Sequence, residues 1–299
     1  MPSPGARLRA AWAEESVMIP GTFNALTAKM AERLGYRAVY LSGGALSAGW
    51  AGLPDIGLLS LTEFVDQAAV IARATNLPLL CDADTGFGEA INVERTVRLF
   101  EQAGVAGIHL EDQVLPKRCG HLSGKSVVDT STMVAKIRAA VAARKDPDFV
   151  IVARTDARNV ESFESAVDRA HAYLEAGADM IFPEALESVQ EFAAFAEQVE
   201  APKLANMTEF GKSPMLSMQE LATFDYRAVL FPLTAFRVAM RAAEDLLREL
   251  KERGTQRDLL DRMQKRSELY EVLGYQDWEA KDRAYFGGDD ASDEPTSEA

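Results

Sequence analysis

Three acidic residues stand at the ends of two short apolar runs, with a spacing that suits a divalent metal ion. Asp82 and Asp84 end the run 77–84, and Glu111 lies near the end of the run 107–112. Residues two apart on a strand face the same side of a sheet, so both aspartates can point to one place. Mg²⁺ prefers oxygen ligands and keeps several waters. We expect Asp84 to bind Mg²⁺ directly, or Mn²⁺ in its place, with Asp82 and Glu111 binding directly or through water.

A purely structural role for the same three acids is the alternative, in which each of them caps a following helix or pairs with an arginine of the fold. A zinc site with several histidine ligands is not expected, because the chain has only 3 histidines. The occurrence of all three acids at the ends of neighbouring runs favours the metal site.

One cysteine lies within a cluster of basic residues. Cys119 is preceded by Lys117 and Arg118 and is followed by Gly120 and His121. Nearby cations lower the pKa of a thiol, and a glycine-containing loop can close over a bound substrate. The thiol could act as a nucleophile, with His121 as its base, or as a general acid or base. An incidental cysteine in a basic surface loop is the remaining interpretation.

Several other groups are suited to binding carboxylates. Arg154 ends an apolar run, where a guanidinium can hold a carboxylate through two hydrogen bonds. The Ser-Gly-Gly turn at 42–44 offers a hydroxyl and backbone N–H groups to another carboxylate. Asn206 and Thr208, again two apart, can reach a further one. Two more arginines, which taken alone are more typical of salt bridges, are Arg237 and Arg266.

Eight short apolar runs recur along the chain, and segments with helical periodicity separate them. This alternation predicts a parallel (β/α)8 barrel of the TIM type, a fold of about 250 residues in which functional side chains gather at the C-terminal ends of the strands. The acids and Arg154 all stand at such ends. The eight runs are 17–21, 38–44, 77–84, 107–112, 149–156, 180–184, 203–208 and 228–233, and clear helical segments are 25–34, 62–74 and 162–176.

The barrel is expected to have additions at both ends. A leading helix is predicted at 7–16, and the connection 113–129 is long enough for a lid or a binding loop. Further helices within 256–278 carry apolar side chains that need a surface to pack against, for which a neighbouring subunit is a candidate. We expect one barrel domain with trailing helices over 1–285 and an acidic, disordered tail over 286–299.

Composition excludes several classes of partner. The formal net charge of −14 would repel nucleic acid and anionic membrane surfaces. No apolar run approaches the roughly 18 residues of a membrane span, and the polar, basic start of the chain has no stretch of signal-peptide length. The 2 cysteines form no disulfide framework. We therefore expect a cytoplasmic protein whose partner is a small molecule.

Six motifs together resemble the isocitrate lyase and phosphoenolpyruvate mutase superfamily, over about residues 17–278. The central one is Lys-Arg-Cys-Gly-His at 117–121. No motif position departs from the pattern of the superfamily. The supporting phrases are Leu-Ser-Gly-Gly at 41–44, Cys-Asp-Ala-Asp-Thr-Gly-Phe-Gly at 81–88, His-Leu-Glu-Asp-Gln at 109–113, Ala-Arg-Thr-Asp-Ala at 153–157 and Phe-Pro-Glu-Ala at 182–185.

The resemblance implies a metal-assisted retro-aldol cleavage of the C2–C3 bond of 2-methylisocitrate to pyruvate and succinate, a step of propionate catabolism in the methylcitrate cycle. Asp82 and Asp84 would bind Mg²⁺, with Glu111 acting through water. Cys119 would protonate the carbanionic carbon as general acid, and Tyr40 or a water near Asp55 would be the base. The expected catalytic residues are Cys119, Arg154, Tyr40 and His121. The expected substrate-binding residues are Ser42, Gly43, Gly44, Cys119, Gly120, Arg154, Glu184, Asn206, Met207, Thr208, Arg237 and Arg266.

The resemblance also implies an eighth helix exchanged between subunits, in a homotetramer built as a dimer of dimers. Three alternative functions stay open. The nearest is the same cleavage of isocitrate, which lacks the methyl group, to glyoxylate and succinate. Phe182 and Leu230 could line a pocket for that methyl. The others are phosphonate chemistry, against which the cysteine argues, and a catalytically silent barrel that binds carboxylates.

Overall fold

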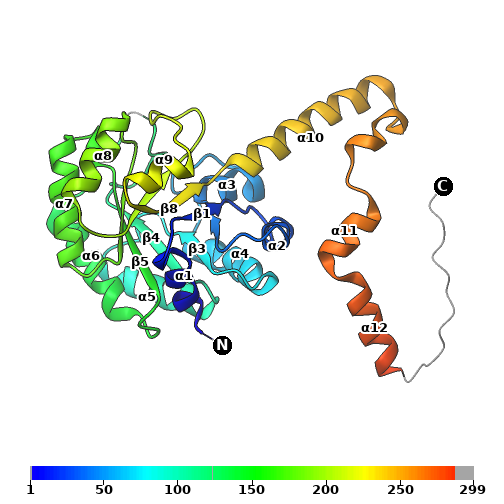
Figure 1. Cartoon of the computed structure of the whole chain (residues 1–299), viewed down its shortest axis with the longest axis horizontal. Helices are drawn as coiled ribbons and strands as arrows, with labels where there is room; N and C mark the ends of the chain where they lie inside the picture. The colour runs from blue at the N-terminus through cyan, green and yellow to red at the C-terminus, as the bar shows by residue number, and fades with distance from the viewer. Residues whose placement is uncertain (1, 123, 287–299) are drawn as a thin grey trace. The chain divides into compact units, whose positions relative to one another are not determined.

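The chain folds into eight parallel strands that form a nearly closed barrel, as the sequence predicts (Figure 1). The computed structural model describes residues 2–122 and 124–286. The sheet order is β1-β8-β7-β6-β5-β4-β3-β2. A bridge between Gly21 and Tyr40 links β1 to β2, where the N–H of Thr22 donates to the Tyr40 carbonyl at 2.7 Å. The strands are β1 (Val17–Pro20), β2 (Val39–Leu41), β3 (Leu79–Asp82), β4 (Gly107–Glu111), β5 (Val150–Thr155), β6 (Met180–Pro183), β7 (Lys203–Asn206) and β8 (Tyr226–Phe231).

Helices follow the strands and cover the barrel. Several begin at side-chain caps that the sequence supplies, such as Ser60 with Glu63 and Ser217 with Glu220. The helices are α1 (Pro4–Ala13), α2 (Ala25–Arg33), α3 (Gly43–Leu46), α4 (Leu61–Ala74), α5 (Ala90–Gln102), α6 (Thr130–Ala143), α7 (Phe163–Glu175), α8 (Val189–Gln198), α9 (Met218–Thr223), α10 (Thr234–Arg253), α11 (Arg266–Leu273) and α12 (Tyr275–Tyr285). Short η segments are the π-helical turn Ser47–Ala51 and the 3₁₀ turns Ala157–Asn159 and Arg257–Arg262.

Two apolar layers explain why the strands read as nearly continuous apolar runs. Side chains that point into the barrel, among them Ile19, Leu80 and Val152, form one buried cluster, and those that face the helices form another. A parallel sheet is covered on both faces, so both sets of side chains are apolar. Leu8 and Trp12 of α1 belong to the inner cluster, so α1 closes the barrel at the N-terminal ends of the strands and leaves the opposite ends for the site.

One local prediction needs correction. The leading helix is Pro4–Ala13 rather than 7–16, because the Ser3 hydroxyl caps it and Pro4 suits a first helical turn. In the turn after β2, Ser42 caps α3, and its hydroxyl accepts from the N–H of Ala45 at 3.4 Å.

The long connection between β4 and α6 is tied down at its base. The N–H of Val114 donates to the Ser126 carbonyl at 2.8 Å, and Gln113 exchanges side-chain hydrogen bonds with the Arg118 backbone at 2.9 Å. We call residues 117–121 of this connection the flap.

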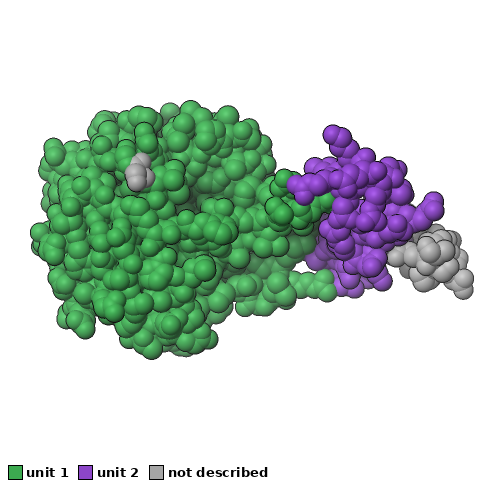
Figure 2. Space-filling view, turned by 90° about the horizontal axis from the view of Figure 1, so that it is seen from above, with its two compact units in different colours: residues 1–246 green, residues 247–299 purple. Residues whose placement is uncertain are grey.

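The chain divides into two compact units, residues 1–246 and 247–299 (Figure 2). Helix α10 carries no buried residue. The division of the sequence into 1–285 and 286–299, and the exchange of a helix between subunits, stay predictions. Residues 287–299 of the expected acidic tail lie outside the described residues. Within the described part of the chain, none of the helices has the length and apolar character of a membrane span.

Candidate active site

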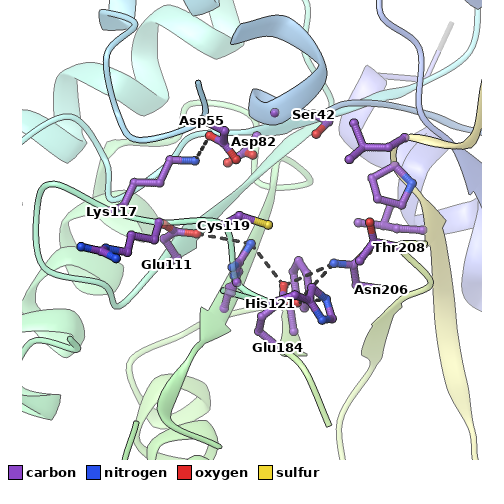
Figure 3. Close-up of a pocket in the computed structure, with 18 of the residues that line it drawn as sticks. Ser42, Asp55, Asp82, Glu111, Lys117, Cys119, His121, Glu184, Asn206 and Thr208 are labelled. Atoms are coloured by element: carbon purple, nitrogen blue, oxygen red, sulfur yellow. Dashed lines mark hydrogen bonds and ion pairs between the residues drawn. The ribbon is translucent and has the colours of Figure 1, made fainter. Parts of the chain in front are cut away.

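A pocket lies at the C-terminal ends of the strands and brings together most of the predicted residues (Figure 3). Asp82, Glu111 and Lys117 lie on one side, Asn206 and Thr208 lie on the other, and the sulfur of Cys119 lies between them. The cavity volume is about 60 Å³, well below the roughly 300–1,000 Å³ of small-molecule sites. The cavity in this structure is therefore smaller than the space that a typical small-molecule ligand needs. The lining residues are Tyr40, Ser42, Gly44, Asp55, Asp82, Glu111, Lys117, Arg118, Cys119, Gly120, His121, Arg154, Phe182, Glu184, Asn206, Thr208, Leu230, Pro232 and Leu233.

Asp82 is held in place by several hydrogen-bond donors. It ends β3, and its two oxygens accept the N–H groups of Gly43 and Asp84, each at 3.0 Å. Its Oδ1 lies 3.4 Å from Nε2 of His109. Burial alone would raise the pKa of Asp82, but His109, Lys117 and Arg154 lower it to about 2. Asp82 is therefore a fixed carboxylate at neutral pH.

Asp84 lies beside Asp82, on a backbone turn with a φ of 45°. Its Oδ1 forms an ion pair with Nζ of Lys117 at 2.7 Å. Burial and the charge of Asp82 raise the pKa of Asp84 to about 7, despite the opposing effect of Lys117. An additional cation would stabilise this pair of carboxylates.

Glu111 completes the acidic set from the end of β4. Its Oε2 lies 3.3 Å from Nη1 of Arg154, while its buried Oε1 has no hydrogen-bond partner. Burial raises the pKa of Glu111 well above its ordinary value. Carboxylate oxygens of this kind, one of them without a partner, fit a hard divalent cation. No cluster of three acidic, histidine or cysteine ligands is preassembled in the described residues. Lys117 is paired with one oxygen of Asp84.

Lys117 is a member of the site that sequence reasoning did not assign. Its side chain is 3 % exposed and pairs with both Asp84 and Asp55. Burial would lower the pKa of Lys117, but the surrounding acids, first Asp84 and then Glu111, raise it well above its ordinary value. Its position two residues before Cys119 is the feature of the sequence that could have indicated a role in the site. Its pairing with Asp55 could not be predicted, because the two residues are 62 positions apart in the sequence.

Arg154 lies where three carboxylates converge. Its Nη1 lies 3.3 Å from Glu111 and 3.2 Å from Glu184, and its Nε donates to Asp156 at 2.9 Å. Its guanidinium carbon stands 5.1 Å from the ring centre of Phe182. These contacts fix a positive group at the pocket wall, suited to a substrate carboxylate.

The thiol of Cys119 is protonated at neutral pH. Burial is the main cause and raises its pKa above the ordinary value of 9.0. This corrects the expectation that neighbouring basic residues would lower the pKa: Lys117 pairs with Asp84 and Asp55, and Glu184 raises the pKa further. A protonated, half-buried thiol is suited to act as an acid and is a poor nucleophile.

The flap lies directly on the pocket wall. A Cβ at Gly120 would lie 2.3 Å from Nη2 of Arg154 and 2.5 Å from Cγ of Glu184, so only glycine fits there. His121 Nε2 lies 2.7 Å from Glu184 Oε1, and its Nδ1 accepts the N–H of Lys212 at 2.9 Å. Both ring nitrogens of His121 are thus engaged in contacts that hold the flap.

Tyr40 lies at the floor of the pocket. Its hydroxyl shares a 2.7 Å hydrogen bond with Nε2 of His109 and lies 3.5 Å from Asp82. Burial, with Asp82 adding to it, raises the pKa of Tyr40 well above 10.0, so the phenol is neutral. His109, which sequence reasoning placed only on the face of Glu111, is fully buried, and burial lowers its pKa.

The remaining predicted substrate residues are placed unequally. Ser42, Gly44, Asn206 and Thr208 line the pocket, and the Nδ2 of Asn206 donates to Glu184 at 3.3 Å. The other four residues do not line the pocket. The N–H of Gly43 donates to Asp82, and the sulfur of Met207 accepts from the N–H of Leu216. Arg237 pairs with Glu209 at 3.3 Å, and Arg266 belongs to the unit 247–299. Their roles in substrate binding stay predictions.

Comparisons with known proteins identify the family of this chain. A model of the phosphoenolpyruvate phosphomutase family matches residues 8–251. A 2-methylisocitrate lyase of Aeropyrum pernix is 52 % identical over 280 residues, covering 93 % of this chain and 90 % of that protein. One from Escherichia coli is 49 % identical, covering 93 % and 95 %.

Solved structures show the same fold in related enzymes. A crystal structure of 2,3-dimethylmalate lyase superposes with a TM-score of 0.90 at 35 % identity, covering 98 % of this chain and 99 % of that one. Oxaloacetate acetylhydrolase, with the inhibitor 3,3-difluorooxalacetate, gives 0.89 at 34 % identity, covering 96 % and 99 %. The superfamily is one of metal-dependent enzymes. The chain belongs to the phosphoenolpyruvate mutase and isocitrate lyase superfamily, as one of its carbon–carbon lyases.

Proposed function

We propose that the protein cleaves the C2–C3 bond of 2-methylisocitrate to give pyruvate and succinate, as a cytoplasmic step of propionate catabolism. The observation that carries this proposal is a protonated thiol, Cys119, on a flap between an acidic metal-type site and a carboxylate-binding wall. The identity of about half of all residues with proteins named for this activity supports it.

Asp82 and Asp84 would hold Mg²⁺, or Mn²⁺ in its place, with Glu111 acting through water. The unpartnered Oε1 of Glu111 and the high pKa of Asp84 support this assignment. The bound cation supplies Lewis-acid stabilisation of the negative charge that develops on the oxygens of the pyruvate half.

Different residues of the chain would then carry out the separate steps of a retro-aldol cleavage. Arg154 binds and orients a substrate carboxylate. Its local positive charge also offsets the net negative charge of the protein, because exposed charges are screened over about 8–10 Å. A base takes the proton of the C2 hydroxyl. Of the two candidates, a water beside Asp55 suits this role better than Tyr40, whose neutral phenol is not a base. As the C2–C3 bond breaks, its electron pair moves into the carboxylate attached to C3, and C2 becomes the ketone carbon of pyruvate.

Cys119 completes the reaction by donating its thiol proton to C3, which yields succinate. The closed flap excludes water from the charged intermediate while this proton moves. The raised pKa of Cys119 keeps the proton on sulfur until a strongly basic carbanion forms beside it.

Release of pyruvate from 2-methylisocitrate tests the proposal. The purified protein should form pyruvate and succinate in equal amounts when Mg²⁺ is present. A protein that binds succinate but turns over neither 2-methylisocitrate nor isocitrate would instead be a silent carboxylate-binding barrel.

Cleavage of isocitrate is the second candidate function. Phe182 and Leu230 line the pocket and give it an apolar wall that suits an additional methyl group. A methyl pocket discriminates by only about 10–200-fold, so we expect measurable activity on isocitrate at a lower kcat/KM. A higher kcat/KM on isocitrate would reverse the assignment.

We further propose that the enzyme is a tetramer built from two dimers that exchange their trailing helices. The exposed length of α10 supports this, since none of its residues is buried within one chain. Sedimentation of the full chain measures the oligomeric state, and a monomer that remains fully active would contradict the proposal.

A further inference from the structure

A second lysine, Lys125, connects the flap to the wall of the pocket. Its side chain is 2 % exposed, and its Nζ donates to Oδ1 of Asp156 at 2.6 Å and to the carbonyl of Gly120. The ammonium thus spans a backbone group of the flap and a carboxylate that follows β5. A buried ammonium needs such partners, because desolvation without them is costly.

Asp156 is itself held in place by the barrel, and its carboxylate also contacts Arg154, the arginine proposed to bind the substrate. Its N–H donates to Oδ1 of Asp112 at 2.8 Å. Its carboxylate accepts Nε and Nη2 of Arg154 at 2.9 and 3.2 Å, as well as Lys125. Burial alone would raise the pKa of Asp156, but Arg154 and then Lys125 lower it to about 2. One ionised carboxylate therefore serves both cations.

The flap cannot lift without disturbing these contacts. Gly120 packs so closely against Arg154 that no Cβ fits between them. Raising its carbonyl away from the wall requires either that Lys125 release Gly120 or that Lys125 leave Asp156.

We propose that Lys125 is a positioning residue that latches the flap in its closed state, through the same carboxylate that orients Arg154. Lys125 does not touch the reacting atoms. It sets how long Cys119 stays closed over the pocket, and it ties flap closure to the orientation of the arginine that binds substrate. The catalytic meaning of the latch rests on the proposed function, whereas the latch itself can be measured without substrate.

Alkylation of Cys119 by iodoacetamide in the full-length protein measures flap opening. Cys81 is fully buried and serves as an internal reference when labelled peptides are quantified by mass spectrometry. The rate constant of alkylation is measured as a function of pH. Its plateau at high pH reports the access of the reagent to the sulfur, and the midpoint of the curve reports the pKa of the thiol. Lys125→Met should raise the plateau by at least about tenfold, which corresponds to about 1.4 kcal/mol.

Three further single variants and one double variant separate a latch from a general loss of stability. Lys203→Met is the matched control, because Lys203 is also buried and donates to two backbone carbonyls, at 3.1 and 2.9 Å, but at the start of β7. It should leave the plateau unchanged. Lys125→Arg keeps the charge and should restore most of the protection. Asp156→Asn should raise the plateau as Lys125→Met does, and the double variant should exceed neither, because both act on one contact.

The outcomes decide the proposal. An unchanged plateau in Lys125→Met, an equal rise in Lys203→Met, or additive effects of Lys125→Met and Asp156→Asn would each overturn it. A change confined to the midpoint would show that Lys125 acts only on the thiol pKa, which also overturns it. If 2-methylisocitrate proves not to be the substrate, the labelling result stands unaffected, so the two failures are distinguishable.

Discussion

Replacement of Cys119 by serine tests the proposed mechanism most directly. The structure gives the thiol one decisive property, a proton retained at neutral pH because burial raises its pKa above 9.0. A serine hydroxyl occupies less space and is a much weaker acid, so the change removes the proton donor while leaving Arg154 and the acidic site in place. General-acid catalysis contributes typically about 10²–10⁴-fold.

We therefore expect kcat for pyruvate formation from 2-methylisocitrate to fall by about 10²–10⁴-fold, a loss of about 3–5 kcal/mol in transition-state stabilisation. KM should change by less than about threefold, since an interaction made only in the transition state lowers kcat and kcat/KM together. A coupled assay of pyruvate release measures both constants. A kcat for Cys119→Ser within a few-fold of the parent protein would refute the role of the thiol as proton donor.

The pH profile provides an independent check on the same residue. The acid must be protonated to act, and its pKa in the folded protein lies above 9.0. Activity that depends on it should persist through neutral pH and decline only as the pH rises beyond that value. Activity that rises with pH through a pKa near 7 or below would instead indicate that the thiolate is the reactive form and that Cys119 acts as a nucleophile.

Three more predictions concern the surroundings of the thiol. Gly120→Ala should lower kcat/KM by about 100-fold, because its Cβ would lie 2.3 Å from Arg154 Nη2; full activity would show that the closed flap is not the reacting state. Chelation with EDTA should lower pyruvate formation by at least about 100-fold, with recovery on addition of Mg²⁺; activity that survives exhaustive chelation would exclude the metal site. Asp156, whose pKa falls from 3.8 unfolded to about 2 folded, should contribute about 2 kcal/mol of stability above pH 4 that disappears as the pH falls toward 2. The difference in free energy of unfolding between the parent protein and Asp156→Asn, measured with urea, should therefore become smaller in acid. A difference that does not change with pH would contradict the ionised state of Asp156.

The barrel itself could be predicted because its physics is local and repeated. Each strand is buried on both faces, so it leaves an apolar run in the sequence, and the helices between the runs keep their own periodicity. Once eight such units are recognised, the closed sheet assigns Asp82, Glu111 and Arg154 to the same end of the barrel. The runs and the observed strands differ by a few residues at their ends, because the runs include polar residues that follow the strands, such as Asp84, Asp156 and Glu184.

The order of residues along the chain is enough to predict the fold, the end of the barrel that carries the chemistry, and the residue types available there. How those residues are charged and connected depends on their arrangement in the folded protein. The thiol of Cys119 has a raised pKa because burial outweighs the opposing effects of the hydrogen bond with the His121 backbone and of Arg154. Lys117 reaches Asp55 across 62 residues, and His121 meets Lys212 across 91. Proton affinity depends on burial and on neighbours in space, and neither can be obtained from spacing along the chain.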